Sequence, residues 1–223
     1  SESPADFVRT VIGPLEPKVV VVGENFRFGS KAAGDVSTLD KLGKGRFEEN
    51  GLPLVRFADE ETCSTRIREA LEAGNVRHAA EHLGRLFAFR GKVVHGDHRG
   101  HSLGFPTANV AIPDDREAPA DGVYAGWLTR LDGLDGCGGL LVGGEKPTRF
   151  PAAISVGNNP TFEAGAKRRI EAHIPGRDDL DLYGAPVSVE FVERLRGMVK
   201  FNSKDELIAQ MKADVDETLE LLA

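Results

Sequence analysis

The sequence is short of cysteine, of long hydrophobic runs and of positive charge. Cys63 and Cys137, its two cysteines, lie far apart and fit no metal-ligand spacing, so a reducing cytoplasm is the simple inference. No apolar run approaches the ~20 residues that span a membrane, and no signal peptide is visible. Lysine and arginine number 28 against 35 acidic residues, and the net charge of -7 argues against nucleic acid as the main partner. The composition therefore favours a cytoplasmic protein that binds neither a membrane nor nucleic acid.

The first part of the 223-residue chain alternates helix and strand signals. A serine cap followed by a proline and an acid predicts a short helix over residues 4–12. The β-branched run at residues 18–22 predicts a parallel strand that is buried on both faces. A further helix is expected over residues 35–42, and a further strand over 52–57. This α/β arrangement has only two parallel strands, which make a poor sheet, so it looks like the second half of a larger domain.

Residues 64–84 predict two short helices that lead into a second domain, with Leu71, Val76 and Leu83 facing inward. From Phe87 the pattern changes to short strands with glycine-rich turns. Strands are expected over residues 88–95, 107–112, 122–131, 151–157, 169–175 and 186–195. Strands at this spacing, with no long helix between them, indicate a small antiparallel barrel.

The last helix begins at a capping box, Ser203-x-x-Glu206. Apolar residues then recur at helical spacing: Leu207, Ile208, Met211, Val215 and Leu219. We expect this apolar face to pack on the barrel.

Glycines, a proline and two polar side chains meet in the stretch from Gly100 to Asn109. The glycines let the backbone turn sharply or approach a ligand, and Pro106 suits the start of an edge strand. Strand alternation then puts Thr107 and Asn109 on one face. A hydroxyl and a carboxamide side by side can hold a hydrated Mg²⁺ and the phosphates that it bridges. The alternative interpretation is a polar strand start after an ordinary loop.

Several motifs follow one another in the order of a known family. They are Arg99-Gly100 with LGFPTAN at 103–109, DGVYAG at 121–126, SVGNNPTF at 155–162, EAHI at 171–174 and DLYG at 181–184. Together they resemble the riboflavin kinase family. More specifically, they resemble the kinase module of the bacterial bifunctional FAD synthetases, which join a riboflavin kinase to an FMN adenylyltransferase. The resemblance runs from about Leu83 to the C-terminus and independently implies a six-stranded barrel.

The resemblance implies a catalytic role for Glu171, which matches the glutamate regarded as the general base of the family. A positioned carboxylate can take the proton of the ribityl 5′-hydroxyl as that oxygen attacks the γ-phosphorus of ATP. Strand alternation alone favours a simpler interpretation, in which Glu171 is a solvent-facing glutamate. His173, on the same face, is expected to be structural or to support a neighbouring group.

Further substrate contacts are implied by the same resemblance. Thr107 and Asn109 would hold the Mg²⁺ that bridges the β- and γ-phosphates of ATP. The residues expected at ATP are Arg99, Gly100, His101, Gly104 and Tyr183. Asn159 and Arg196 are expected on the flavin side, where the flat ring system needs an apolar slot, with the space between the barrel and the last helix as one candidate.

The loop before LGFPTAN departs from the family at His101, where a basic residue is common. A mostly neutral imidazole there would weaken phosphate binding at pH 7. His95, His98 and His101 recur every three residues, which would suit a transition metal. They lie in a loop with no second cluster of ligands, so we do not expect zinc there.

A weaker resemblance covers the residues before the kinase module. GENFRFG at 23–29 and STRIR at 64–68 are similar to the C-terminal half of the adenylyltransferase module, which implies remnant nucleotide contacts at Asn25, Ser64, Thr65 and Arg68. The alternative is that Ser64 only caps its helix. The H-x-G-H signature of that module is expected in a first βα unit. Its copy at residues 98–101 has no buried strand ahead of it and is treated as a coincidence, so we expect an incomplete adenylyltransferase site.

The sequence thus predicts an α/β remnant of a Rossmann-like nucleotidyltransferase domain with connector helices over residues 1–84, and a kinase barrel with a C-terminal helix over 85–223. The expected activity is that of a riboflavin kinase, which uses ATP and Mg²⁺ to convert riboflavin to FMN. One alternative is a bifunctional FAD synthetase, if an N-terminal half is present in a longer chain. Another is a flavin-binding module without turnover, although such a module would need neither a base nor a metal site.

Overall fold

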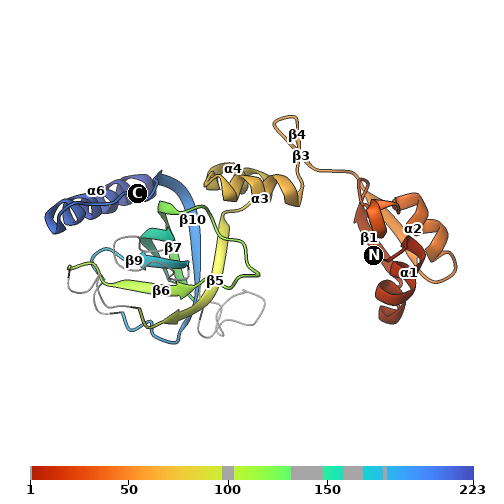
Figure 1. The fold of residues 1–223 in the computed structure, drawn as a ribbon, viewed down its shortest axis with the longest axis horizontal. Coiled ribbons are helices and arrows are strands. Elements are labelled where there is room, and N and C mark those ends of the chain that lie inside the picture. Colours follow the sequence, from red (N-terminus) through yellow and green to blue (C-terminus); the bar gives the residue numbers. More distant parts are fainter. Residues whose placement is uncertain (1, 97–102, 132–147, 158–167, 178–179) are drawn as a thin grey trace. The chain divides into compact units, whose positions relative to one another are not determined.

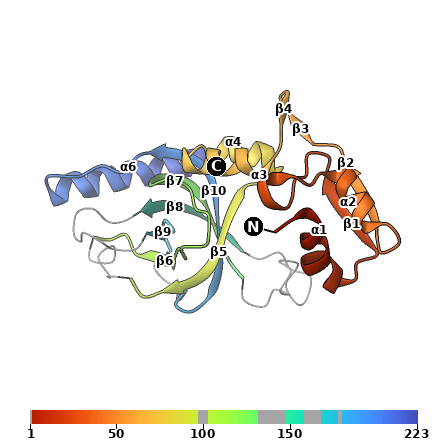
Figure 2. The same cartoon turned by 45° about the vertical axis from the view of Figure 1, so that its right-hand side comes forward.

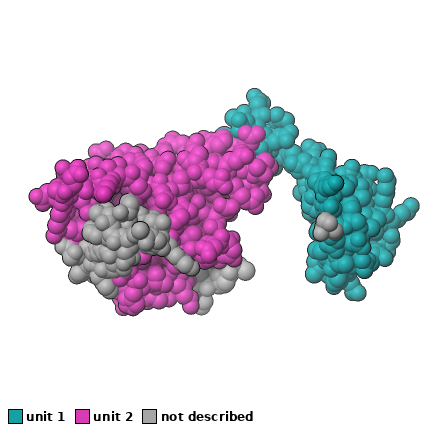
Figure 3. Space-filling model, viewed as in Figure 1, with its two compact units in different colours: residues 1–62 teal, residues 63–223 magenta. Residues whose placement is uncertain are grey.

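The computed structural model describes residues 2–96, 103–131, 148–157, 168–177 and 180–223. The chain divides into two compact units, residues 1–62 and 63–223, which Figure 3 colours separately. Each unit has a hydrophobic core of its own.

The first unit is built on two parallel strands (Figure 1). Strand β1 (Val19–Gly23) pairs with β2 (Glu48–Leu52), so the expected α/β arrangement is present. The predicted strand over residues 52–57 is only partly right: β2 ends at Leu52, and the short strand β3 (Arg56–Phe57) pairs with β4 (Glu60–Glu61) instead of with β1. Glu48 to Gly51 carry no apolar alternation and become a strand only through their pairing with β1.

Strand β1 is buried on one face rather than on both. Val20 and Val22 pack against the core of the first unit, whereas Val19 and Val21 are 48% and 54% exposed. The prediction of a strand buried on both faces is therefore wrong for the described residues. A β-branched run fixes the strand type, but its burial depends on which elements cover each face.

Two helices complete the core of the first unit. Helix α1 (Pro4–Phe7) begins at Ser3, whose hydroxyl accepts the N–H of Asp6, and it continues as the helical turn η1 (Val8–Ile12), as predicted. Helix α2 (Val36–Gly43) begins at Asp35, whose carboxylate accepts the hydroxyl and the backbone N–H of Thr38 at 2.7 and 2.8 Å. These two hydrogen bonds lower the pKa of Asp35.

The second unit begins with two connector helices, α3 (Ser64–Glu72) and α4 (Val76–Leu83). Leu71 and Val76 are each 1% exposed and belong to the barrel core, as expected, while Leu83 is only half-buried. The backbone N–H of Ala120 donates to the carbonyl of Leu71 at 2.8 Å, which ties α3 to the barrel. The two helices therefore pack within the second unit, and the functional division at residue 84 stays a prediction.

Six antiparallel strands close the predicted barrel in the order β10-β5-β6-β9-β8-β7 (Figure 1). They are β5 (Phe87–Val94), β6 (Thr107–Ala111), β7 (Gly122–Arg130), β8 (Arg149–Gly157), β9 (Arg169–His173) and β10 (Pro186–Arg196). The barrel interior is filled by side chains that include Leu128, Ile154, Ile170 and Val189, all fully buried. The fold class predicted from the sequence is confirmed.

The last helix, α6 (Lys204–Leu222), lies along β7 and β8, as Figure 2 shows. The Ser203 hydroxyl accepts the N–H of Glu206, which confirms the serine half of the capping box, while the Glu206 carboxylate accepts the N–H of Asn202 instead of that of Ser203. The predicted apolar face is partly wrong, since Leu219 is 41% exposed and the most buried residues are Asp214 and Thr218. A buried carboxylate is tolerated here because Arg196 donates to both of its oxygens, at 2.9 and 2.7 Å.

Candidate active site on strands β6 and β9

The polar residues of the LGFPTAN and EAHI motifs face one another across two neighbouring strands. Antiparallel pairing of β6 with β9 sets Asn109 opposite Glu171 and Thr107 opposite His173. Ala108 and Ala172 form the pair between them, on the other face of the sheet. The expectation that Thr107 and Asn109 share a face therefore extends to the proposed base.

Asn109 is a buried polar residue whose side chain is held by hydrogen bonds. Its side chain is buried, and its Nδ2 donates to the hydroxyl and the carbonyl oxygens of Thr107, each at 3.3 Å. Gly96 lies directly against it, since a methyl group at that position would come within 2.5 Å of Asn109 Nδ2. The lack of a side chain at residue 96 thus makes room for the Asn109 carboxamide. The hydroxyl and amide oxygens of this pair are the hard donors that Mg²⁺ prefers.

Glu171 lies between two other strands on this face. It pairs with Asn109 of β6 on one side and with Ser155 of β8 on the other. Its side chain is half-buried, so a substrate hydroxyl can approach the carboxylate while the strands limit its movement. This combination suits a positioned proton acceptor.

His173 supports the start of strand β6. Its Nδ1 donates to the carbonyl of Pro106 at 2.9 Å, and its ring meets the edge of Phe105 with centroids 5.2 Å apart. The side chain is buried. These contacts are those expected of the structural role given to His173, since they hold the two residues that precede Thr107.

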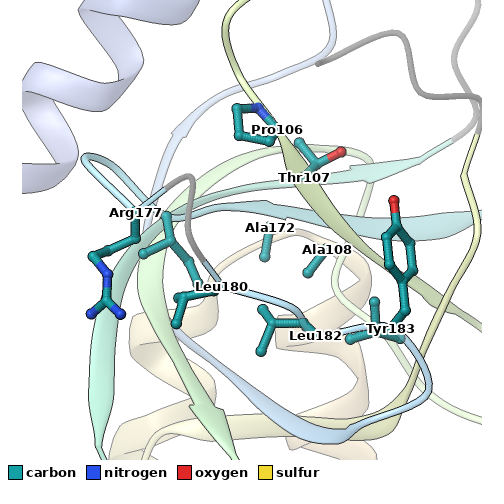
Figure 4. A pocket seen from close by; sticks show the side chains of 10 residues that line it. Pro106, Thr107, Ala108, Ala172, Arg177, Leu180, Leu182 and Tyr183 are labelled. Carbon is teal, nitrogen blue, oxygen red and sulfur yellow. The ribbon is translucent and has the colours of Figure 1, made fainter.

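A cavity of about 380 Å³ opens beside these strands. Its lining is mostly apolar and includes Ala108 and Ala172, with the Thr107 side chain at its edge (Figure 4). Arg177 and Tyr183 stand on opposite sides of it. The size and the apolar floor suit a flat heteroaromatic ring, and the polar groups at the rim suit a charged group attached to that ring.

Tyr183 is set in place by a second aromatic ring. It stacks on His95, with ring centroids 4.3 Å apart, and it remains half-exposed. A half-exposed ring at the side of a cavity is able to contact a ligand. Nothing in the sequence around His95 indicated this contact, because the two residues lie on different segments and meet only in the folded barrel.

Arg177 is a cavity residue that sequence reasoning missed. It follows the Pro175-Gly176 turn after β9, and its guanidinium lies over the Phe150 ring at 5.0 Å. An arginine directly after the EAHI strand and a turn was the available signal. Its position gives the cavity a positive charge.

The remaining predicted site residues lie in other parts of the chain. Arg196 forms the ion pair with Asp214 of α6, on the helix side of the barrel. Asn25 is exposed in the first unit, while Ser64, Thr65 and Arg68 are exposed on α3 in the second unit. Ser64 is the first residue of α3, and the N-cap position before it is occupied by Cys63. The interpretation of Ser64 as the helix cap is therefore wrong. Arg68 pairs with Glu117 at 3.5 Å.

The loop that leads into LGFPTAN is described only at its end. Gly104 has a φ of +83°, a conformation that favours glycine, and a side chain there would meet no other group within 4 Å. Arg99, Gly100, His101 and Asn159 lie outside the described residues.

Two family models match the chain. One, described as riboflavin kinase, matches residues 83–222, and the other, described as FAD synthetase, matches residues 1–66. The bifunctional riboflavin kinase/FMN adenylyltransferase of Listeria monocytogenes is 32% identical over 216 residues, which are 97% of this chain and 64% of that protein. The protein of the same name from Escherichia coli is 36% identical over 201 residues, which are 90% of this chain and 59% of the relative. The chain thus spans about three fifths of the length of these relatives.

Among solved structures, the chain is similar to a crystal structure from Streptococcus pneumoniae described as a macrolide-efflux protein. The TM-score is 0.72 at 35% identity, and the match covers 98% of this chain and 65% of that one. In the part of the chain that the structure describes, no helix is both long and apolar enough to cross a membrane.

Proposed function

This chain belongs to the riboflavin kinase family, and we propose that it transfers the γ-phosphoryl group of ATP to the ribityl 5′-hydroxyl of riboflavin, which gives FMN and ADP. The observation that carries the proposal is the convergence of Thr107, Asn109 and Glu171 on one face of two paired strands. A plain binding module would need neither a proton acceptor nor a pair of hard oxygen donors. Phosphoryl transfer needs both, because it depends on positioning and on charge neutralisation.

Glu171 is the proposed general base. The 5′-hydroxyl loses its proton as its oxygen bonds to the γ-phosphorus, and the Glu171 carboxylate accepts that proton while the bond from the γ-phosphorus to the leaving ADP oxygen breaks. The pairing of Glu171 with Asn109 and Ser155 fixes the strand that carries the carboxylate. His173 and Pro106 hold the adjoining strand in position through their hydrogen bond.

Thr107 and Asn109 are the proposed holders of Mg²⁺. When bound, the metal would neutralise negative charge on the phosphates of ATP. The contact between Gly96 and Asn109 supports the assignment, because it keeps the carboxamide beside the Thr107 hydroxyl. No other hydroxyl and carboxamide are paired in this way on β6 and β9.

ATP and riboflavin are assigned to separate sets of residues. The cavity beside Thr107 is the proposed place for the nucleotide, with Tyr183 at its side and Arg177 supplying positive charge. The proposed phosphate contacts come from the preceding loop: Arg99, Gly100, His101 and Gly104. Asn159 and Arg196 remain the proposed flavin contacts, and Arg196 lies on the side of the barrel that carries α6.

A second activity, transfer of an adenylyl group from ATP to FMN, is favoured by the match of residues 1–66 to the FAD synthetase family. Asn25, Ser64, Thr65 and Arg68 are the proposed nucleotide contacts of that site. Both activities are proposed for the cytoplasm, where riboflavin and ATP are available.

The decisive experiment is turnover of riboflavin by the purified chain with Mg²⁺ and ATP, with the flavins separated by chromatography. The proposal predicts FMN, and no FMN when Mg²⁺ is chelated. Appearance of FAD would add the adenylyltransferase activity. Bound riboflavin without any product would replace the kinase by a flavin-binding module.

A further inference from the structure

Two histidines one helical turn apart lie side by side on α4, at a distance in sequence from every residue assigned to the kinase site. Residues four apart share one face of a helix, so His78 and His82 project in the same direction. Their rings meet edge to face with centroids 4.6 Å apart. One ring nitrogen of each lies within 4.8 Å of one ring nitrogen of the other.

We propose that His78 and His82 form a binding site for a divalent transition metal ion of the Zn²⁺, Cu²⁺ or Ni²⁺ class. Imidazole nitrogen suits these metals, whereas Mg²⁺ prefers oxygen donors. Zinc binds imidazole nitrogen at about 2.0–2.1 Å, so two nitrogens around one tetrahedral ion stand about 3.4 Å apart. A small rotation of the half-exposed His78 side chain closes the remaining distance. Water would supply the other ligands.

A carboxylate already supports one of the two rings. Glu81 Oε2 lies 3.4 Å from His78 Nδ1, one turn away on the same helix. A carboxylate that accepts the proton of one ring nitrogen orients the imidazole, the arrangement common around zinc histidines. Glu81 therefore acts as a positioning residue for the proposed site.

The helix that carries the pair is anchored along its length. The Asn75 side chain accepts the backbone N–H of His78 at 3.1 Å, which fixes the first turn. Arg77 donates to Glu193 of β10 at 2.6 Å, and Ala79 is fully buried in the barrel core. His82, in the last turn of α4, is itself buried, with 6% of its surface exposed. Because the helix is already rigid, bringing the two rings together around an ion costs little conformational entropy.

Zinc titration of the full chain by calorimetry, in excess Mg²⁺, tests the proposal independently of the kinase activity. We expect one Zn²⁺ per chain and a zinc-dependent rise in melting temperature, because an ion that binds only the folded state stabilises it. His78→Ala removes the half-exposed ligand and is expected to abolish both effects. Glu81→Gln should weaken zinc binding by about tenfold or more.

His98→Ala is the matched control, because His95, His98 and His101 form a second histidine series in the sequence. That variant is expected to bind zinc like the unmodified chain. Circular dichroism checks that each variant keeps its fold. The proposal is overturned if the unmodified chain binds no zinc, or if His78→Ala binds it with unchanged affinity. Loss of binding in His98→Ala alone would assign the metal to the loop instead.

Discussion

Asn109 of β6 and Glu171 of β9 lie directly opposite each other across two antiparallel strands. Opposed residues share a face of the sheet, with Cβ atoms about 4.5–5.5 Å apart. Backbone hydrogen bonds therefore fix the proposed metal-binding amide relative to the proposed base. Sites built on strands are held more precisely than sites built on loops, so the register of β6 and β9 is the feature on which the proposed reaction most depends.

Glu171→Gln is expected to lower kcat by about 10²–10⁴-fold, because the amide cannot accept the proton of the 5′-hydroxyl. Riboflavin binding should survive, since the side chain keeps its size. Steady-state kinetics and a riboflavin fluorescence titration measure the two effects separately. Glu190→Gln is the control: Glu190 is also a barrel-strand carboxylate, paired with Arg149 at 3.0 Å, and its loss should leave turnover nearly unchanged. Unchanged turnover in Glu171→Gln would exclude Glu171 as the base.

Thr107→Ala should raise the Mg²⁺ concentration needed for half-maximal rate by about tenfold or more, the effect of losing about 1.4 kcal/mol of binding. The hydroxyl is a proposed metal ligand, and it also accepts a hydrogen bond from Asn109. A rate titration with Mg²⁺ at fixed ATP measures the change. Thr148→Ala, at an exposed threonine before β8, is the control. An identical Mg²⁺ titration in Thr107→Ala and in the unmodified chain would remove Thr107 from the metal site.

The barrel could be predicted from the sequence because its strands carry strong local signals. The run from Gly122 to Arg130 is apolar and β-branched between turn residues, and its observed bounds differ from the predicted ones by one residue. Strand β2 could not be predicted, because its sequence is polar and only pairing with β1 makes it a strand. Local composition was therefore enough to predict a strand that has an apolar pattern of its own. It failed for a strand that forms only through pairing with a neighbouring strand.

The candidate site was predictable only in part, for a similar reason. Alternation along β6 placed Thr107 and Asn109 on one face without any knowledge of the fold. The pairing of Asn109 with Glu171 depends on the register between strands that are far apart in the sequence, which no local pattern encodes. The partner of Arg196 was hidden in the same way, because Asp214 occurs in a helix whose pattern predicted only an apolar face.

Gly96→Ala is expected to disturb the metal site without unfolding the barrel. The new methyl group would come within 2.5 Å of the Asn109 amide, which must then move away from Thr107. We expect a raised Mg²⁺ requirement, of the same direction as in Thr107→Ala, with little change in melting temperature. Gly197→Ala is the matched control, since a methyl group there has its nearest contact at 3.9 Å. Normal Mg²⁺ dependence in Gly96→Ala would show that the Asn109 position is unimportant for the metal.

We expect Tyr124 to make the stability of the barrel sensitive to alkaline pH. Its ring is fully buried, its hydroxyl donates to the Ala120 carbonyl at 2.6 Å, and burial raises the pKa of the phenol above its usual value of 10.0. The unfolded chain ionises near pH 10 while the folded chain keeps the proton, so this contribution is complete below pH 10 and is lost as pH rises through the folded pKa. Tyr124→Phe should cost about 1 kcal/mol at pH 8 and weaken the alkaline loss of stability. Urea unfolding at several pH values measures both, and equal pH dependence in the two proteins would contradict the assignment.

Asp214→Ala should destabilise the barrel by about 3–5 kcal/mol, because it leaves the Arg196 guanidinium without its partner beneath α6. The double variant Arg196→Met, Asp214→Leu removes both charges and should recover most of that loss, since apolar side chains of similar volume can replace a buried ion pair. Urea unfolding measures these differences in the free energy of unfolding. Equal destabilisation in the single and double variants would show that the ion pair is not what anchors α6.

The folded double variant also tests the proposed flavin contact, because weaker riboflavin binding than in the unmodified chain is expected if Arg196 touches the flavin. Unchanged binding would leave Arg196 only the role of holding α6 against the barrel.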